Sequence, residues 1–230
     1  MIRRGDGGEM RGLVFDGRYI TDRPSGIGVV CAELLRGFAL LPDAAGMRVL
    51  LRPGTPLPGE VRGAAHLDLV EVPYGPHGIR NQLQLPGLLR RLGTDMLHGT
   101  DCFNPVLARR VGLLVTVHDL IPLICRRQLA RSRKVRLLPL WKAWVRRQCL
   151  RARAVIAVSR RTASDLTSLL GVPADSIRVI HNPLRALPAA GPADGFRKRH
   201  GLEGARVLSY AGRRDPYKNL LALVRALPAV

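Results

Sequence analysis

The chain has 230 residues, which allows one or two domains, and its 47% hydrophobic and 23% charged residues are ordinary for a globular protein. It has 37 lysines and arginines against 17 acidic residues; the resulting net charge of +20 predicts attraction to phosphate, nucleic acid or anionic membranes, unless it reflects a general preference for arginine. The four cysteines lack CxxC spacing, and no apolar stretch reaches the roughly 18 residues of a membrane span, so the sequence predicts neither a disulfide framework nor a transmembrane helix.

Short apolar runs alternate with longer helical patterns along most of the chain. The apolar runs predict strands at 12–16, 47–51, 67–72, 95–99, 111–117, 154–159 and 176–182. Apolar residues at helical spacing predict helices at 29–41, 81–93, 128–153 and 160–171. Continuous apolar strands separated by helices are typical of a parallel sheet that is covered on both faces. We therefore expect an α/β fold with a doubly wound parallel sheet.

The regular alternation breaks at residues 183–200, where proline and glycine replace large apolar side chains. We expect this segment to link two domains. The first is a Rossmann-like domain at 10–182, preceded by a loose tail at 1–9. The second begins at 201–230, with its first strand predicted at 205–212 and a helix after it.

Two glycines, Gly26 and Gly28, connect the first predicted strand to the first predicted helix. Ligands of doubly wound sheets bind beyond the carboxyl ends of the strands, where glycine lets the backbone approach a phosphate and the helix N-terminus offers free amides. The alternative is a turn that simply contains glycines. The missing third glycine of GxGxxG argues against a nicotinamide dinucleotide.

Polar residues follow or end three more of the predicted strands. His118 and Asp119 come directly after the most apolar strand, where a histidine can donate to a sugar hydroxyl or a phosphate, or else bond to a loop carbonyl. His98 ends the preceding strand and either faces the same cleft or caps its loop. Ser159 stands where a good helix N-cap is needed, and the G-x-S-x-G context of a nucleophilic serine is absent.

Residues 126–153 combine a dense basic face with apolar side chains that include Trp141 and Trp144. This combination suits an anionic membrane surface. It equally suits a helix whose apolar side faces the core while its arginines face solvent. Pro139 is expected to interrupt the helix, which weakens both interpretations.

The stretch YAGRRDPYKN places Arg213 and Lys218 between the strand predicted at 205–212 and the helix after it. An arginine can hold two oxygens as a fork, a lysine adds a point charge, and the helix dipole adds to both. This spacing predicts a phosphate clamp. The alternative is a surface turn in which Asp215 pairs with the arginines.

Taken together, the motifs resemble the retaining, nucleotide-sugar-dependent glycosyltransferases of family 4, which have the GT-B fold of two Rossmann-like domains. The resemblance runs from about residue 12 to residue 230. The order and spacing of the motifs together are specific. The motifs that carry the resemblance are DGRYITDRPSGIG, LHGTDCFNP, VTVHDLIP, VIAVSRRTASDLTSLLGVPADSIRVIHNP and YAGRRDPYKNL.

The resemblance implies a role for each motif. Gly26 and Gly28 would lie near the diphosphate of the donor, and His118 would contact the transferred sugar. Arg213 and Lys218 would hold the donor phosphates and stabilise the leaving nucleoside diphosphate. Three further residues would lie in the cleft: Asn104, Asp119 and Ser159.

The resemblance also implies the partners of the protein. It implies a nucleotide-diphosphate sugar as donor and a glycan or lipid-linked acceptor, with no metal or cofactor and no specific nucleic acid. We expect a cytoplasmic protein that touches the inner, anionic membrane face peripherally through 126–153.

The sequence departs from the family pattern in three places. Val29 stands where the family often has arginine, and HNPL stands for the more usual HNGV. The nucleotide pocket and paired glutamates of the family would lie beyond Val230, so we expect a truncated chain that binds donor poorly. A non-catalytic remnant that serves as an interaction domain is therefore an alternative. A basic nucleic-acid-binding module is another, although only 4% of the residues are aromatic and no recognition motif is present.

Overall fold

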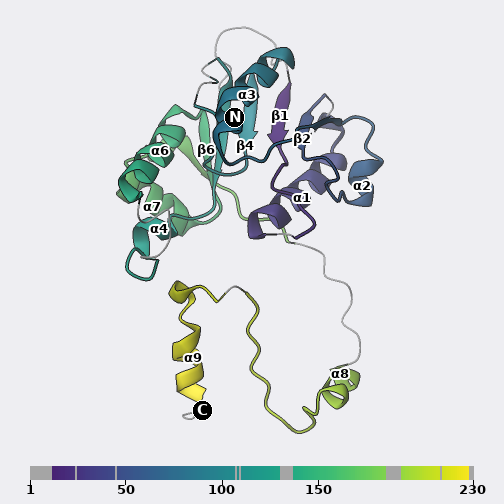
Figure 1. The fold of residues 1–230 in the computed structure, drawn as a ribbon, viewed down its shortest axis with the longest axis vertical. Coiled ribbons are helices and arrows are strands. Elements are labelled where there is room, and N and C mark those ends of the chain that lie inside the picture. Colours follow the sequence, from purple (N-terminus) through teal and green to yellow (C-terminus); the bar gives the residue numbers. More distant parts are fainter. Residues whose placement is uncertain are drawn as a thin grey trace.

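A seven-stranded parallel β-sheet forms the centre of the described part of the chain (Figure 1). The computed structural model describes residues 12–23, 25–44, 46–106, 108, 110–129, 137–184, 193–212 and 214–227. The strands are β1 (Leu13–Asp16), β2 (Arg48–Leu51), β3 (Asp68–Glu71), β4 (Met96–Gly99), β5 (Gly112–Val117), β6 (Ala154–Ala157) and β7 (Ile177–Val179). Their order across the sheet is β3-β2-β1-β4-β5-β6-β7, and every neighbouring pair is parallel.

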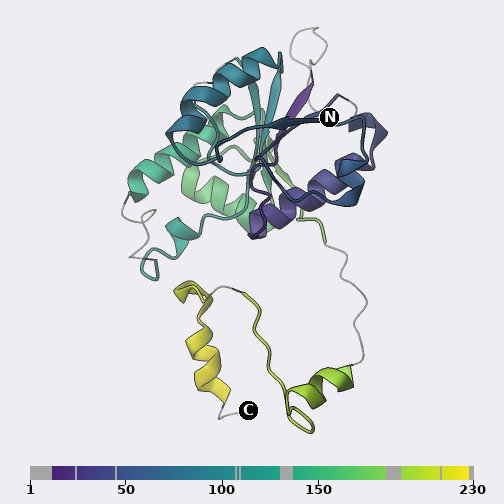
Figure 2. The same ribbon diagram turned by 45° about the vertical axis from the view of Figure 1, so that its right-hand side comes forward.

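Helices cover both faces of this sheet (Figures 1 and 2). The longer ones are α1 (Gly26–Ala39), α3 (Ile79–Arg91), α6 (Leu138–Arg151) and α7 (Arg160–Leu170), and the short ones are α2 (Gly59–Arg62), α4 (Ile121–Ile124), α8 (Ala193–Arg199) and α9 (Leu220–Ala226). Within the described residues, 3-10 turns lie at Pro42–Ala44, Ala174–Ser176 and Pro216–Lys218.

The core is split into two clusters, one on each face of the sheet. Val14 belongs to the cluster beneath α3, α6 and α7, whereas its neighbour Phe15 belongs to the cluster beneath α1 and α2. Successive residues of a strand point to opposite faces, so both faces must be apolar if both are covered. The expected doubly wound parallel α/β fold is confirmed.

The outer strands differ from the inner ones in composition and exposure. Asp68 and Glu71 are exposed at the ends of β3, and Arg178 is exposed in β7 at the opposite edge. Inner strands such as β4 are completely buried. An edge strand has one free side, so it can carry charged residues that an inner strand could not accommodate.

In the basic stretch 126–153, residues 126–129 form a turn and helix α6 begins at Leu138, while residues 130–136 lie outside the described residues. Pro139 does not interrupt it, because a proline in the first helical turn lacks only an amide that has no intrahelical acceptor. Trp141 and Trp144 pack against the core, and the Trp144 indole N–H donates to the Cys102 carbonyl at 2.9 Å. The structure therefore favours the alternative in which the apolar side faces the core. None of the described helices is long and apolar enough to cross a membrane.

The strand predicted at 205–212 is absent from the structure, and these residues run as an exposed, extended segment. A strand is stabilised by its hydrogen-bonded neighbours, and none of the described residues pairs with this one. The predicted helix after it is α9, preceded by the 3-10 turn Pro216–Lys218. Helix α8 lies inside the expected linker 183–200. Figure 1 shows these C-terminal elements apart from the sheet, and the second domain remains a prediction.

Candidate functional site

The strand order reverses between β1 and β4, which makes the carboxyl ends of these two strands the expected ligand site of a doubly wound sheet. Hydrogen bonds tie the two following loops together. The Thr100 hydroxyl donates to the Asp16 carbonyl at 2.8 Å, and the Tyr19 hydroxyl donates to the Asp101 carboxylate at 3.2 Å. Burial, together with Asp101, raises the pKa of Tyr19, so its hydroxyl remains a hydrogen-bond donor. The switch point, which is the place where the strand order reverses, thus has its two loops joined by hydrogen bonds.

One of these loops, the one after β1, contains a buried arginine. The Arg18 guanidinium, in a residue only 1% exposed, makes two hydrogen bonds of 2.8 and 2.7 Å to the Asp16 carboxylate. It also donates to Asn81 of α3 at 2.8 Å, and the Asn81 amide donates to the Phe103 carbonyl at 2.9 Å. Burial alone lowers the pKa of Arg18, but the Asp16 carboxylate together with Tyr74 and Tyr19 more than offsets this, and the pKa is raised. The network fixes the loops after β1 and β4 against α3.

The two glycines at the start of α1 have different surroundings. Ser25 is the N-cap, and its hydroxyl accepts from the Gly28 amide at 3.1 Å. A Cβ atom at Gly28 would lie 2.6 Å from the Tyr19 carbonyl oxygen, whereas a Cβ atom at Gly26 would meet nothing within 4 Å. Close packing against the loop after β1 therefore requires glycine at position 28. Gly26 faces open space at the helix N-terminus.

These surroundings predict opposite effects of alanine at the two glycines. We expect Gly28→Ala to lower the free energy of unfolding by about 1–3 kcal/mol, because backbone atoms must move to admit the methyl group. Gly26→Ala is the matched control, and it should leave stability unchanged or raise it by up to about 1 kcal/mol, since alanine restricts the unfolded chain. Urea denaturation of both variants measures the difference, and equal effects would contradict the packing argument.

His118 follows β5 at the carboxyl edge, and its ring is half-buried. Its Nε2 atom lies 3.0 Å from the Thr100 carbonyl oxygen. A carbonyl oxygen only accepts, so Nε2 carries the hydrogen and the neutral ring has Nδ1 as an acceptor. The His118 carbonyl in turn accepts from the Thr162 hydroxyl of α7 at 3.2 Å. The histidine is therefore bonded to a loop carbonyl and still has one nitrogen for a ligand hydroxyl.

His98 belongs to the core instead of facing a cleft or capping a loop. It lies within β4, is 4% exposed, and places Nε2 at 2.9 Å from the Thr116 hydroxyl of β5. Its ring meets Phe15 edge to face at 5.3 Å between centroids. Burial lowers the pKa of His98 to about 4, so the ring is neutral at physiological pH. Sequence position alone does not separate it from His118.

Three predicted cleft residues make local structural hydrogen bonds. The Asp119 carboxylate accepts from the amide of Ile121, the first residue of α4, at 3.0 Å. Ser159 is the N-cap of α7. Asn104 is buried, and its amide donates to the Asp101 carbonyl at 2.7 Å while the side chain packs over the backbone of Gly99. All three shape the loops of the carboxyl edge.

The predicted phosphate clamp lies in the C-terminal segment. Arg213 is outside the described residues. Lys218 ends a 3-10 turn, is exposed, and has its ammonium group 6.0 Å from the centre of the Tyr217 ring. Within the described parts of the chain, no hydrogen bond or ion pair joins Lys218 to the carboxyl edge, and the clamp remains a prediction.

Sequence reasoning misses the polar network under the switch point. From the sequence, Asp16 is only the end of a predicted strand, and neither Arg18 nor Asn81 has a predicted role. The available signal is the string DGR immediately after an apolar strand, where opposite charges two residues apart can pair. Nothing in the sequence indicates that the Asn81 side chain, 63 residues further along the chain, accepts a hydrogen bond from the Arg18 guanidinium.

The fold and the ordered switch point define an α/β protein of the Rossmann-like class, with its site at the carboxyl edge of a parallel sheet. The family model described as Glycosyltransferase Family 4 matches residues 24–185, which is more than half of the chain. The chain therefore belongs to glycosyltransferase family 4. No curated protein sequence matches it.

Solved structures of HepE from Anabaena are similar in fold. The HepE complex with UDP and glucose is 18% identical, with a TM-score of 0.58, and the match covers 95% of this chain and 58% of HepE. The complex with UDP-glucose is 15% identical, with a TM-score of 0.51, and the match covers 89% of this chain and 55% of HepE. The described parallel sheet and its helices thus have the Rossmann-like fold found in glycosyltransferase structures, and the chain spans less than two thirds of the HepE length.

Proposed function

We propose that the protein transfers a sugar from a nucleotide-diphosphate sugar to an acceptor, with retention of configuration. Membership of glycosyltransferase family 4 over residues 24–185 is the observation that carries this proposal. The UDP and UDP-glucose complexes of HepE, which has the same fold, support a nucleoside diphosphate as the leaving group.

Two groups at the carboxyl edge suit the sugar and the diphosphate. His118 donates Nε2–H to the Thr100 carbonyl, so its Nδ1 is the atom that would accept from a hydroxyl of the transferred sugar. Gly26 faces open space at the start of α1, where free amides and the helix dipole attract an anion. Gly28 contributes by letting α1 approach Tyr19 closely.

Arg213 and Lys218 complete the proposed site from the second lobe. In that role they neutralise the negative charge that develops on the leaving nucleoside diphosphate. The charge they supply is what a bound metal would otherwise provide, so we propose that the reaction needs no metal or cofactor. The role requires the C-terminal segment to approach Gly26 when donor is bound.

We propose a glycan or a lipid-linked acceptor, and a cytoplasmic site of action. The 126–153 stretch is the proposed peripheral contact with an anionic membrane. Its tryptophans pack against the core, so the contact would be made by its basic residues. The domain organisation that goes with this function has a linker at 183–200 and a second lobe from 201.

The test uses a form of the protein in which both proposed lobes are complete, and it measures the release of nucleoside diphosphate from a panel of nucleotide sugars, including UDP-glucose, in the presence of glycan and lipid-linked acceptors. We expect one donor to be consumed, and His118→Ala to lower kcat by about 10²-fold because a positioned polar contact to the sugar is lost. His66→Ala is the matched control and should retain most activity, since His66 also lies within hydrogen-bond distance of a backbone carbonyl, that of Phe38, but it precedes β3 at the opposite end of the strands. Unchanged kcat in His118→Ala would contradict the assigned role, and no donor consumption would contradict the function.

A further inference from the structure

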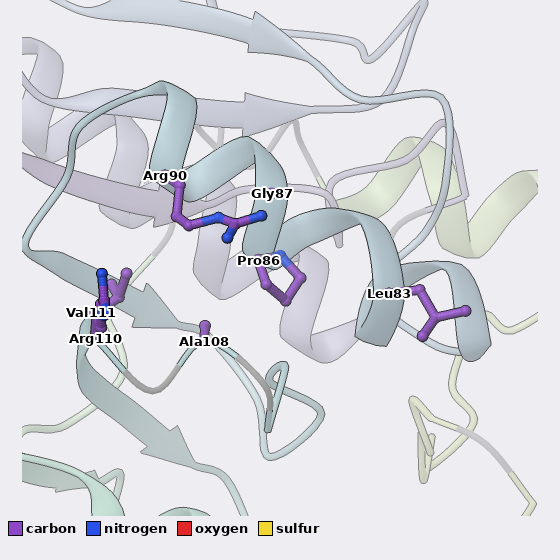
Figure 3. Close-up of a pocket in the computed structure, with 7 residues that line it drawn as sticks. All are labelled: Leu83, Pro86, Gly87, Arg90, Ala108, Arg110 and Val111. Atoms are coloured by element: carbon purple, nitrogen blue, oxygen red, sulfur yellow. The ribbon is translucent and has the colours of Figure 1, made fainter.

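A cavity of about 480 Å³ lies between α3 and the loop that leads into β5, away from the carboxyl edge. Figure 3 shows its lining, which comes from one stripe of the helix and from the residues just before the strand. The lining residues are Leu83, Pro86, Gly87, Arg90, Ala108, Arg110 and Val111. This volume lies within the range of roughly 300–1,000 Å³ typical of small-molecule sites.

The loop that forms one wall is held in place from two sides. The Gln82 side chain of α3 accepts from the Val106 amide at 3.0 Å and donates to the Asn104 carbonyl at 3.2 Å. From α6, the Arg151 guanidinium donates to the carbonyls of Pro105 and Ala108. The cavity is therefore bounded by an anchored backbone.

The chemistry of the lining is apolar with two cations. Leu83, which is 63% exposed, and the buried Ala108 and Val111 provide apolar surface. The guanidinium groups of Arg90 and Arg110 also line the cavity, and neither forms an ion pair with a carboxylate in the described parts of the chain. Each can therefore offer its fork of N–H donors to an anion.

We propose that this cavity binds a phosphate monoester that carries a short apolar chain. A phosphate monoester has close to two negative charges at neutral pH, which matches the two guanidinium groups. The chain would occupy the apolar part of the cavity beside Leu83, Pro86 and Ala108. Binding here would be in addition to the proposed sugar transfer.

The site is distinct from the carboxyl edge. Arg110 precedes β5 and His118 follows it, and the six residues of this strand span roughly 20 Å. A phosphate held by the two arginines is therefore too far from His118 to be the phosphate of the sugar donor. The ligand is a second molecule, independent of donor and acceptor.

Isothermal titration calorimetry of the full 230-residue chain with hexyl phosphate tests the proposal. We expect binding that weakens at least tenfold in Arg90→Ala/Arg110→Ala, since two charge-assisted contacts are lost. The double variant Arg62→Ala/Arg80→Ala removes the same charge from exposed arginines outside the cavity and should bind as the parent does. Equal loss in both double variants would show that net charge alone attracts phosphate and would overturn the proposal.

The apolar half of the site is tested separately. Inorganic phosphate should bind at least tenfold more weakly than hexyl phosphate, because each buried methylene contributes a factor of roughly four. Gly87→Leu should abolish hexyl phosphate binding, because its side chain would fill the cavity and displace the Arg90 guanidinium, which lies 4.0 Å from a Cβ atom at this position. It should not unfold the protein, since leucine favours a helix more than glycine does. Equal binding of the two ligands, or unchanged binding by Gly87→Leu, would overturn the proposal.

A third arm asks whether the ligand comes from solution or from a bilayer. We propose that the ligand enters the cavity from solution, so hexyl phosphate should bind without lipid present. Co-sedimentation with phosphatidic acid vesicles that depends on Arg90 and Arg110, combined with no binding of hexyl phosphate, would overturn it in favour of a membrane headgroup.

Discussion

Arg18→Met is expected to lower the free energy of unfolding by about 3–5 kcal/mol, the usual effect of removing one partner of a buried ion pair. Methionine keeps most of the length of the side chain, but it leaves the Asp16 carboxylate buried without its two hydrogen bonds of 2.8 and 2.7 Å. Asn81 loses a donor at the same time. Urea denaturation followed by circular dichroism measures the change.

Arg62→Met is the matched control, because Arg62 is exposed and lies on the short helix α2. Surface substitutions of this kind usually change stability by less than about 0.5 kcal/mol. The double variant Asp16→Asn/Arg18→Met should be less destabilised than the sum of its single variants, because the two groups interact directly. A loss below about 1 kcal/mol in Arg18→Met would contradict the network as a stabilising feature of the switch point.

Arg213→Ala and Lys218→Ala are each expected to lower kcat by about 10²–10³-fold, as does the loss of one group that stabilises transition-state charge. The reason is that the leaving nucleoside diphosphate gains negative charge as the sugar bond breaks. Steady-state kinetics with a nucleotide sugar measure the effect, in a form of the protein that is active in transfer. Circular dichroism should show no change in the sheet, since Lys218 is exposed.

Arg214→Ala is the matched control for these two variants. It removes an exposed positive charge next to the proposed clamp without removing a clamp residue. We expect its kcat to stay within a factor of about three of the parent, because a solvated surface charge contributes little. If all three variants lost activity equally, the effect would come from general charge, and the clamp would be wrong.

The sheet could be predicted from sequence because its strands are buried on both faces. A run such as Gly112–Val117 has apolar residues in succession, and at this length such a run is typical of a buried strand. The predicted start of the helix that forms α6 is wrong, since a proline inside a helical pattern signals either an interruption or a first turn. The strand predicted at 205–212 does not form, because pairing partners decide whether apolar residues become a strand.

The candidate site is harder to predict than the fold, because contacts across the sheet decide what each polar residue does. His98 and His118 occupy similar places in the sequence, yet one lies against Phe15 in the core and the other at the edge. The sequence suggests a phosphate-binding role for Gly28, but the requirement for glycine there comes from the Tyr19 carbonyl. Such distances between distant segments are not encoded in local spacing.

The charged outer strands have a consequence for self-association. Strands β3 and β7 are short, and they place Asp68, Glu71 and Arg178 where another molecule would have to add its own strand. Charges on an edge make such an addition costly, because the approaching backbone would have to desolvate them. The sheet therefore resists end-to-end growth between molecules, and this protects a highly apolar parallel core from templated aggregation.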